Sequence, residues 1–355
     1  MTETISARKS ISVISVISVG QKNNFFFAGN PFGSGGPCEV NKSYVRHLHG
    51  RVSHLTMAHP IQQFLEIIFK LLTCRVIIFS GVRSIDHLLL PLCRLFHKRI
   101  LFIMHGCMDY ENAVNHYPNA RGERNEAMML RDAQQILCVS EPFRRWVAAR
   151  YPQYASKTAT LTNGINWETL SPACRHSQQR DSRRIILLGG GRITKHNLEV
   201  CQAVEMVNKT LDEPFHIDIY GPYYDNDASA VLQTMPYTTW HGSVSHEALL
   251  QAMSGAALFI QNSGFEPFSL GVVEALVSGC NILVSQHVGA IDILPGITED
   301  DIIQNPLDIQ ELSEKIQKQL HVSNNTRLLS SIDRGATSSF TAAERLYQIA
   351  LNANP

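Results

Sequence analysis

The stretch Gly264-Phe-Glu-Pro-Phe-Ser-Leu-Gly-Val-Val-Glu-Ala-Leu-Val-Ser-Gly279 lies between two short apolar runs and decides the fold class. The run before it is Ala257–Gln261, and the run after it is Asn281–Ser285. Pro267 suits the first turn of a helix, and Gly279 suits the position just beyond a helix end. The segment is therefore predicted to form a strand, a turn, a short helix and a second strand, as in a parallel α/β sheet.

Two carboxylates and a run of backbone amides occupy this turn and helix. Glu266 is expected in the loop, and Glu274 is expected on the helix that follows. The N–H groups around Phe268, Ser269 and Leu270 are expected to point outward at the start of the helix. Because a helix N-terminus attracts anions, the segment is predicted to bind a diphosphate.

Similar apolar runs recur along the chain and alternate with helical patterns, which predicts α/β domains with doubly wound parallel sheets. The other runs are Ile11–Val19, Val76–Ser80, Ile100–Met104, Ile136–Val139, Ile185–Leu188 and His216–Tyr220. The polar segment Ser171–Arg184 lacks apolar periodicity and is expected to link two domains, residues 1–170 and residues 184–335. Two Rossmann-like domains that face each other across a cleft place their ligands at the carboxyl ends of the strands.

The composition is that of a folded protein, with 44% hydrophobic and 17% charged residues, and 355 residues suffice for two domains. The eight cysteines lack the spacing of a zinc site or a disulfide framework, which favours a reducing cytoplasm. The Ile11–Val19 run alternates serine with valine or isoleucine, so it is interpreted as a buried strand and not as a signal peptide. Charged residues interrupt the apolar segments 61–79 and 85–104, so neither is predicted to cross a membrane.

The charges divide unevenly along the chain. Residues 1–170 carry 19 Lys and Arg against 11 Asp and Glu, whereas residues 171–355 carry 12 against 20. The first half either faces an anionic partner or attracts the second half. The basic and apolar segments Phe64–Arg75 and Leu88–Arg99 allow two interpretations: a face that binds an anionic membrane surface, or core helices with solvated basic ends.

Three further groups of residues follow predicted strands, where a doubly wound fold places its ligands. Gly189-Gly190-Gly191-Arg192 and Lys195 come directly after the run Ile185–Leu188. His105 directly follows the run Ile100–Met104. It has either a structural role or a role in the site. The Gly35-Gly36-Pro37 turn is either a plain turn or a loop whose missing side chains let the backbone approach a phosphate.

The spacing of Glu266 and Glu274, with seven residues between them, and the letters around them resemble the E-x7-E motif of glycosyltransferase family 4. The resemblance covers most of the chain and implies the GT-B fold, in which two Rossmann-like domains face each other. It implies that Glu266 lies against the donor sugar and that Glu274 accepts hydrogen bonds from the ribose hydroxyls. Arg192 and Lys195 would hold the diphosphate, although the family usually has a longer spacer before this lysine.

The same resemblance implies roles for residues of both domains. His105 would lie near the reacting carbon of the sugar. The remaining donor-binding residues would be Gly35, Gly36, Gly190, Phe268, Ser269 and Leu270. The last helical stretch, residues 339–355, is expected to pack back on the first domain.

The implied activity is that of a retaining glycosyltransferase, which moves a hexose-type sugar from a UDP- or GDP-linked donor to a glycan or lipid-linked acceptor. The implied pathway is bacterial cell-surface polysaccharide or lipopolysaccharide synthesis. We expect no cofactor, no metal and no nucleic-acid partner, and a cytoplasmic location with peripheral attachment to the inner face of the cell membrane. Two alternatives are another GT-B enzyme, such as a nucleotide-sugar epimerase or a phosphorylase, and a non-catalytic membrane-associated partner of a transferase.

The segment Asp225-Asn226-Asp227 matches the DxD pattern by which GT-A enzymes hold a divalent metal on the donor diphosphate. It lies several residues past a predicted strand, in a turn rich in glycine, proline and tyrosine. Asp and Asn are common in turns because their side chains hydrogen-bond to the nearby backbone. We interpret the segment as a solvated loop.

Overall fold

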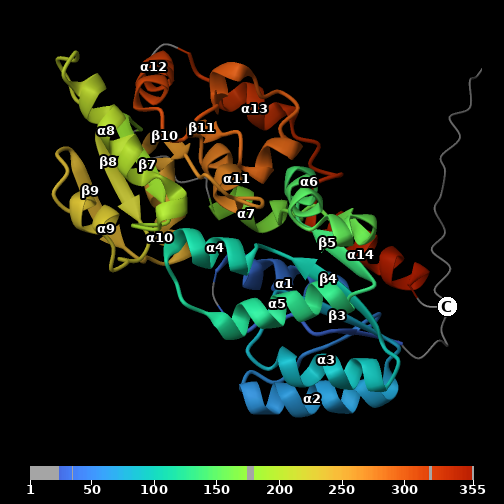
Figure 1. The fold of residues 1–355 in the computed structure, drawn as a ribbon. Coiled ribbons are helices and arrows are strands. Elements are labelled where there is room, and N and C mark those ends of the chain that lie inside the picture. The colour runs from blue at the N-terminus through green and yellow to red at the C-terminus, as the bar shows by residue number, and fades with distance from the viewer. Residues whose placement is uncertain (1–23, 34, 174–179, 320–321, 354–355) are drawn as a thin grey trace, which may run out of the picture.

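A computed structural model of the chain describes residues 24–33, 35–173, 180–319 and 322–353, so the predicted strand Ile11–Val19 lies outside the described residues. Within these ranges the chain forms two parallel six-stranded sheets, each flanked by helices (Figure 1). The predicted class, two doubly wound α/β domains, is confirmed.

The first sheet has the strand order β2-β1-β3-β4-β5-β6, and all neighbouring strands are parallel. The strands are β1 (Phe25–Phe27), β2 (Ser53–His54), β3 (Val76–Ser80), β4 (Arg99–Met104), β5 (Gln135–Cys138) and β6 (Thr158–Thr160). Every residue of β3 is buried, as expected for a central strand that helices cover on both faces. The order reverses between β1 and β3, which makes the loops after them the expected ligand-binding edge.

The second sheet has the order β12-β11-β10-β7-β8-β9 and is also parallel throughout. The strands are β7 (Asp181–Leu188), β8 (His216–Tyr220), β9 (Thr238–Gly242), β10 (Ala256–Gln261), β11 (Asn281–Ser285) and β12 (Ile302–Ile303). Here the order reverses between β7 and β10. The loop with Arg192 and Lys195 follows β7, and the loop with Glu266 follows β10, so both lie at this switch point.

Helices cover the faces of both sheets. The first half of the chain contains α1 (Gly36–His47), α2 (Pro60–Thr73), α3 (Asp86–Leu95), α4 (Met108–Asn115), α5 (Ala120–Asp132), α6 (Glu141–Arg150) and α7 (Trp167–Ala173). The second half contains α8 (Asn197–Asn208), α9 (Asp227–Leu232), α10 (His246–Ser254), α11 (Leu270–Val277), α12 (Ile309–Gln319), α13 (Asn325–Ser331) and α14 (Ser339–Asn352). Short 3₁₀ turns are η1 (Pro152–Lys157), η2 (Ile193–Lys195), η3 (Gly289–Ile293) and η4 (Glu299–Asp301).

Helix α14 returns from the second half of the chain and packs against α1. The Arg51 guanidinium forms an ion pair with Glu344 of α14 and lies 3.9 Å from the ring centre of Tyr347. His47 Nε2 lies 3.0 Å from Ser339 Oγ. The end of the chain therefore ties the two halves together.

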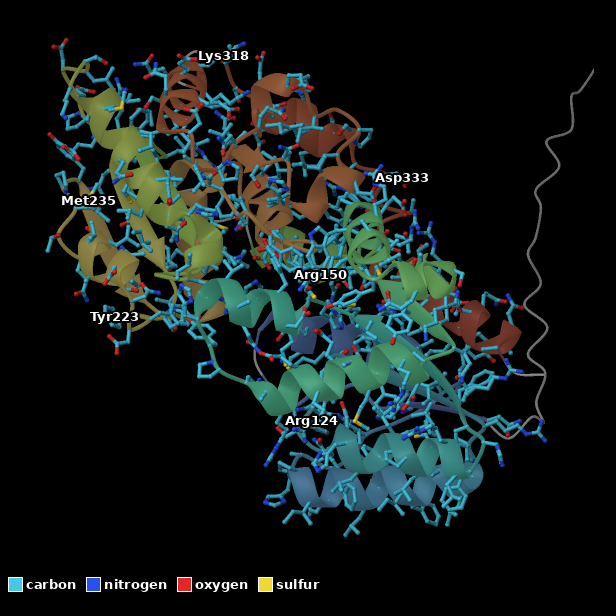
Figure 2. The ribbon with its side chains drawn as sticks, viewed as in Figure 1. Arg124, Arg150, Tyr223, Met235, Lys318 and Asp333 are labelled. Atoms are coloured by element: carbon cyan, nitrogen blue, oxygen red, sulfur yellow. The ribbon has the colours of Figure 1, made fainter. Side chains whose placement is uncertain are left out.

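An aromatic cluster also joins the halves next to the predicted site. The Phe265 ring packs against Tyr110 and Trp146, with centroids 4.9 Å and 4.7 Å away, and against Phe143. Arg150 covers the Trp146 ring and lies at the boundary between the halves in Figure 2. Because Phe265 directly precedes Glu266, this packing fixes the loop that carries the first predicted carboxylate.

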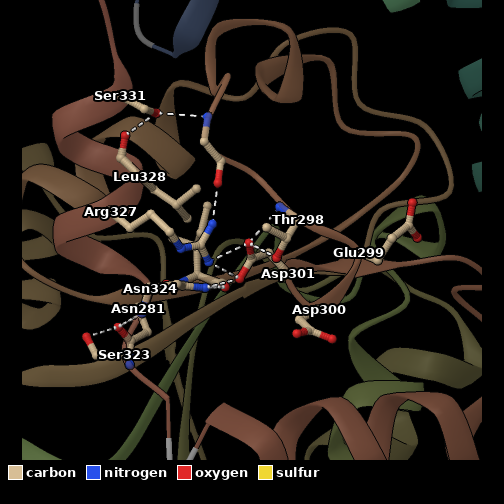
Figure 3. A network of polar contacts seen from close by, with 12 residues as sticks. Asn281, Thr298, Glu299, Asp300, Asp301, Ser323, Asn324, Arg327, Leu328 and Ser331 are labelled. Carbon is tan, nitrogen blue, oxygen red and sulfur yellow. Dashed lines mark hydrogen bonds and ion pairs between the residues drawn. The ribbon is translucent and has the colours of Figure 1, made fainter.

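Inside the second half, a network of polar contacts anchors the edge of the sheet (Figure 3). The buried Asp301 carboxylate accepts hydrogen bonds from Arg327 Nη2 (2.8 Å), Asn324 Nδ2 (2.7 Å) and Thr298 N (2.9 Å). Burial alone would raise the pKa of Asp301, but the hydrogen bonds from Arg327, Asn324 and Thr298 hold it below its ordinary value. The network connects α13 to the turn before β12.

Three sequence-based boundaries are wrong. Helix α11 begins at Leu270, because Pro267 lies in the loop, where its carbonyl accepts a hydrogen bond of 2.6 Å from Ser140 Oγ of the first half. Strand β7 begins at Asp181, so the polar residues 181–184 form its partly exposed start and not a linker. Helix α7 runs to Ala173, into the predicted linker.

Candidate active site

The loop after β7 carries Lys195 and the loop after β10 carries Glu266, and the fold brings the two side chains together in an ion pair. Lys195 is 13% exposed and Glu266 is 17% exposed, so this pair is largely shielded from water. The Glu266 backbone is fixed on both sides, because its N–H donates to His287 O and its carbonyl accepts from Gly289 N. The pair is thus held at the switch point of the second sheet.

Arg192 lies in the same loop as Lys195, three residues before it. One of its terminal nitrogens donates to the Tyr224 hydroxyl (3.2 Å), whereas its Nε has no hydrogen-bond partner among the described residues. The charge of Arg192 acts on Glu111, a carboxyl on α4 of the first half. Burial raises the pKa of Glu111, while Arg192 and Lys195 oppose that rise. Arg192 of the second half and Glu111 of the first therefore line a common space.

Close packing requires a glycine at position 190 of this loop. A Cβ atom at this position would lie 2.2 Å from the carbonyl oxygen of Pro222, and the backbone φ is +57°. Asn197 Nδ2 donates to the Gly190 carbonyl (2.8 Å), which fixes the turn. The glycine thus lets the loop that carries Arg192 pack directly against the loop after β8, which contains Pro222.

His105 stands at the carboxyl end of β4, on the opposite side of the same space. Its Nε2 lies 2.8 Å from Ser80 Oγ, and this hydroxyl donates to Asn41 Oδ1 (2.6 Å). Burial lowers the pKa of His105 to about 4, so the imidazole is neutral at physiological pH. A cavity of about 440 Å³ contains His105 and Glu111 from the first half and Arg192 from the second.

Glu274 lies in a different cavity, of about 410 Å³, which is also lined from both halves. Its Oε1 lies 2.9 Å from His246 Nε2, and this hydrogen bond raises the pKa of His246. Lys42 and Arg46 of α1 line the same cavity. The carboxylate thus has a hydrogen-bond partner and open space beside it.

The start of α1 lies between the two cavities. Pro37 and Cys38 line the cavity that contains His105, and Glu39 lines the one that contains Glu274. Gly35 has a φ of +94°, which favours glycine, and a Cβ atom added at Gly35 or Gly36 would meet nothing within 4 Å. The backbone of this turn therefore faces open space, as a loop that approaches a ligand must.

The residue before α11, Ser269, has a strained backbone conformation. Ser269 has a φ of +78° at the position just before the helix, and its side chain makes no capping bond. The buried Phe268 anchors the turn through its carbonyl, which accepts from Ala290 N (2.6 Å). Leu270, the first helical residue, lines the cavity of Glu274. The first backbone N–H groups of α11 therefore lie beside that cavity.

Sequence reasoning missed Glu111, Asn115 and His246. Glu111 and Asn115 lie on α4, and Asn115 Oδ1 accepts from Thr194 N (3.2 Å) across the two halves. No motif marks Asn115 or His246, because only the fold brings them to the site. The one available signal for Glu111 was its place on the helix that follows the strand ending in His105.

Two other groups of acidic residues have the composition of a metal site. Asn226 caps α9 by accepting from Ser229 N (2.8 Å), and Asp227 is the first residue of that helix, so the Asp-Asn-Asp segment is a helix start and not a plain loop. Among the described residues, Cys107, Asp109 and Glu126 offer ligand atoms close together. Burial raises the pKa of the Cys107 thiol, and Sγ donates to Asp109 Oδ1 (2.8 Å), an arrangement of a protonated thiol.

Part of the chain is similar to known proteins. Residues 175–332 match the model of the family described as Glycosyl transferases group 1. The sulfoquinovosyl transferase SQD2 of Arabidopsis thaliana is 23% identical over 195 residues, which are 52% of this chain and 38% of that relative. The chain thus matches less than half of the length of this relative.

Solved structures resemble the chain over almost its whole length. The Anabaena protein Alr3699/HepE in complex with UDP and glucose has a TM-score of 0.67 at 12% identity, covering 92% of this chain and 99% of that one. Sucrose-phosphate synthase of Thermosynechococcus elongatus has a TM-score of 0.64 at 16% identity, covering 92% and 98%. The fold is therefore GT-B, with two α/β domains.

Proposed function

We propose that this chain is a retaining glycosyltransferase of family 4, which transfers a hexose-type sugar from a nucleotide-sugar donor to a glycan or lipid-linked acceptor. The observation that carries the proposal is the Lys195–Glu266 pair at the switch point of the second sheet, together with Arg192 of the same loop, which lines one cavity with His105 of the first half. The match of residues 175–332 to group 1 glycosyl transferases supports it. The proposed setting is bacterial cell-surface polysaccharide or lipopolysaccharide synthesis in the cytoplasm.

The cationic side chains suit the departure of a diphosphate. When the bond between the sugar carbon and the phosphate oxygen breaks, negative charge grows on the leaving diphosphate. Arg192 and Lys195 are fixed in a largely buried space, where such charge stabilisation is worth most. In the same step the acceptor oxygen bonds to the sugar carbon, and its proton passes to the departing phosphate oxygen.

The ion pair of Lys195 with Glu266 suits the donor site in a second way. Without a donor, each charge neutralises the other in a largely dry environment, which avoids the cost of a buried lone charge. With a donor, Lys195 can contact the diphosphate while Glu266 accepts hydrogen bonds from sugar hydroxyls. Because the Ser80 hydroxyl donates to Asn41, Nε2 of neutral His105 donates to Ser80 Oγ, and Nδ1 remains as an acceptor for a sugar hydroxyl without adding charge.

Glu274 is proposed to hold the ribose of the nucleotide. Its cavity is next to the start of α11, whose free amides would take the diphosphate. Adjacent ribose hydroxyls can both donate to one carboxylate. The Anabaena structures of this fold contain UDP and UDP-glucose, which favours UDP over GDP as the carrier to test first.

The experiment is nucleotide release from a panel of UDP- and GDP-hexoses by the full chain. Replacing Lys195 by methionine is expected to lower the rate about a hundredfold, the usual cost of losing a stabiliser of developing charge. Lys209→Met, which removes a surface lysine paired with Glu205, is the matched control and should keep the rate. Excess chelator should leave the rate unchanged, because Arg192 and Lys195 take the place of a metal.

Analysis of the product separates the proposal from its alternatives. Transfer with the donor's anomeric configuration supports it. A nucleotide sugar with one inverted centre indicates an epimerase, and phosphate-dependent cleavage indicates a phosphorylase. Failure to bind or cleave any member of the panel would indicate a non-catalytic partner.

A further inference from the structure

Helix α2 presents large apolar side chains to solvent. Its exposed residues Ile61, Leu65, Phe69 and Leu72 are 60–66% exposed and follow the spacing of one helix face. The opposite face is the buried one, with Gln63, Ile67 and Leu71. A helix that is apolar on both its buried and its outer face normally has a second apolar partner.

Helix α3, which lies beside α2, also carries exposed apolar side chains. Leu88 and Leu95 are exposed, and α3 packs beside α2. Figure 1 shows the two helices side by side at the end of the molecule farthest from the second sheet. Side chains project from the outer side of α2 with no other element against them (Figure 2). We call the face formed by Ile61, Leu65, Phe69, Leu72, Leu88 and Leu95 the α2–α3 surface.

Most of the charged residues near this surface that form no ion pair are basic. Lys70 is in the last turn of α2, and Arg75, Lys98 and Arg99 follow the ends of the two helices. None of the four forms an ion pair with another described residue. Of the two acids of these helices, Asp86 is buried and pairs with Arg83, whereas Glu66 accepts a hydrogen bond from Thr56 N (3.0 Å) and forms no ion pair with a described residue. The four basic residues therefore outnumber the single acid that has no ion pair.

We propose that the α2–α3 surface binds an anionic lipid bilayer, with its apolar side chains between the lipid chains and its basic residues at the headgroups. An amphipathic helix that lies in the membrane interface has this composition, with large apolar residues on one face and Lys or Arg around it. No helix of the described residues is both long and apolar enough to span a bilayer.

Charge decides between a bilayer and a second copy of the chain. In a two-fold dimer the same patch faces itself, so the basic groups would repel each other around a shared apolar centre. An anionic bilayer supplies the opposite charge and an apolar layer at once. This inference rests on the exposed side chains alone and does not depend on the proposed transfer reaction.

The test is sedimentation of the full chain with vesicles of phosphatidylcholine containing about 30% phosphatidylglycerol, because anionic headgroups attract Lys and Arg. We expect the protein to sediment with these vesicles, little with pure phosphatidylcholine, and to be released between about 0.1 M and about 1 M salt. Leu65→Ser with Phe69→Ser should lower the bound fraction about tenfold, since two inserted side chains are lost.

The matched control is Leu307→Ser with Val322→Ser, which removes two exposed apolar side chains of the second half and should leave binding unchanged. The thermal midpoint of each variant and its rate of nucleotide-sugar cleavage separate loss of binding from loss of fold or of transferase activity. Equal sedimentation of both double variants, or no sedimentation of the parent chain, overturns the proposal. A parent dimer that Leu65→Ser with Phe69→Ser converts to a monomer assigns the surface to a second copy instead.

Discussion

At the scale of single residues, the two glutamates of the E-x7-E spacing lie in different environments. Glu266 is paired with Lys195 in a largely buried position, whereas Glu274 lies beside His246 in a separate cavity. The two carboxylates therefore suit the two proposed roles: Glu266 lies beside Lys195, which is proposed to hold the diphosphate, and Glu274 lies beside open space that is proposed to hold the ribose.

This difference predicts that the two substitutions act on different constants. Glu274→Ala is expected to raise the donor dissociation constant about tenfold or more, because hydrogen bonds to a carboxylate are worth about 1.5–3 kcal/mol. Glu266→Ala is expected to lower turnover with a smaller effect on donor affinity, since it changes the groups at the reacting sugar. Binding calorimetry with the intact donor and steady-state rates measure the two effects.

The control for this pair is Glu205→Ala, which removes a carboxylate that pairs with Lys209 on the surface of α8. It should change neither constant. If Glu274→Ala bound the donor as tightly as the parent chain, the ribose assignment would be wrong. If Glu266→Ala bound the donor much more weakly but turned over the bound donor at the normal rate, Glu266 would have the role assigned to Glu274.

At the scale of secondary-structure elements, the Asp301 network shows how one buried carboxylate holds a sheet edge (Figure 3). Asp301→Asn places an amide donor among the donors of Arg327, Asn324 and Thr298. We expect a loss of about 3 kcal/mol in unfolding free energy at neutral pH, the order found when a buried ion pair is broken. Chemical denaturation measures it.

The lowered pKa of Asp301 also fixes the direction of the pH effect. A carboxyl whose pKa is lower when folded contributes stability above its unfolded pKa and loses it as the pH falls through the folded pKa. The difference between the parent chain and Asp301→Asn should therefore shrink below about pH 4. Asp300→Asn, beside it but exposed and paired with Lys318, should cost under about 1 kcal/mol at any pH.

At the scale of the whole molecule, the aromatic cluster around Phe265 holds the two domains beside the site. Phe265→Ala is expected to lower the unfolding free energy by about 3 kcal/mol, since a packed ring is lost. It should also increase the radius of gyration measured by small-angle scattering, because the domains separate. Phe69→Ala removes a ring from the exposed outer face of α2 and should change neither quantity. An unchanged radius in Phe265→Ala would show that α14 and the Ser140–Pro267 contact suffice to hold the domains.

The sequence by itself determined the fold class and the central strands, because continuous apolar runs separated by helical patterns can be buried only between helix layers. It also placed Arg192, Lys195, Glu266 and His105 at strand ends, where a parallel sheet collects its ligands. It did not determine short edge strands such as β2 and β12, whose two residues each carry almost no pattern.

Only the tertiary structure decided which of these residues meet. The Lys195–Glu266 pair joins positions 71 residues apart, and Asn115 meets Thr194 across 79 residues. Such contacts depend on how two sheets and their loops pack, which no local pattern encodes. The same holds for the outer face of α2: its spacing shows an apolar helix, but solvent exposure of Leu65 and Phe69 depends on which side packs against the sheet.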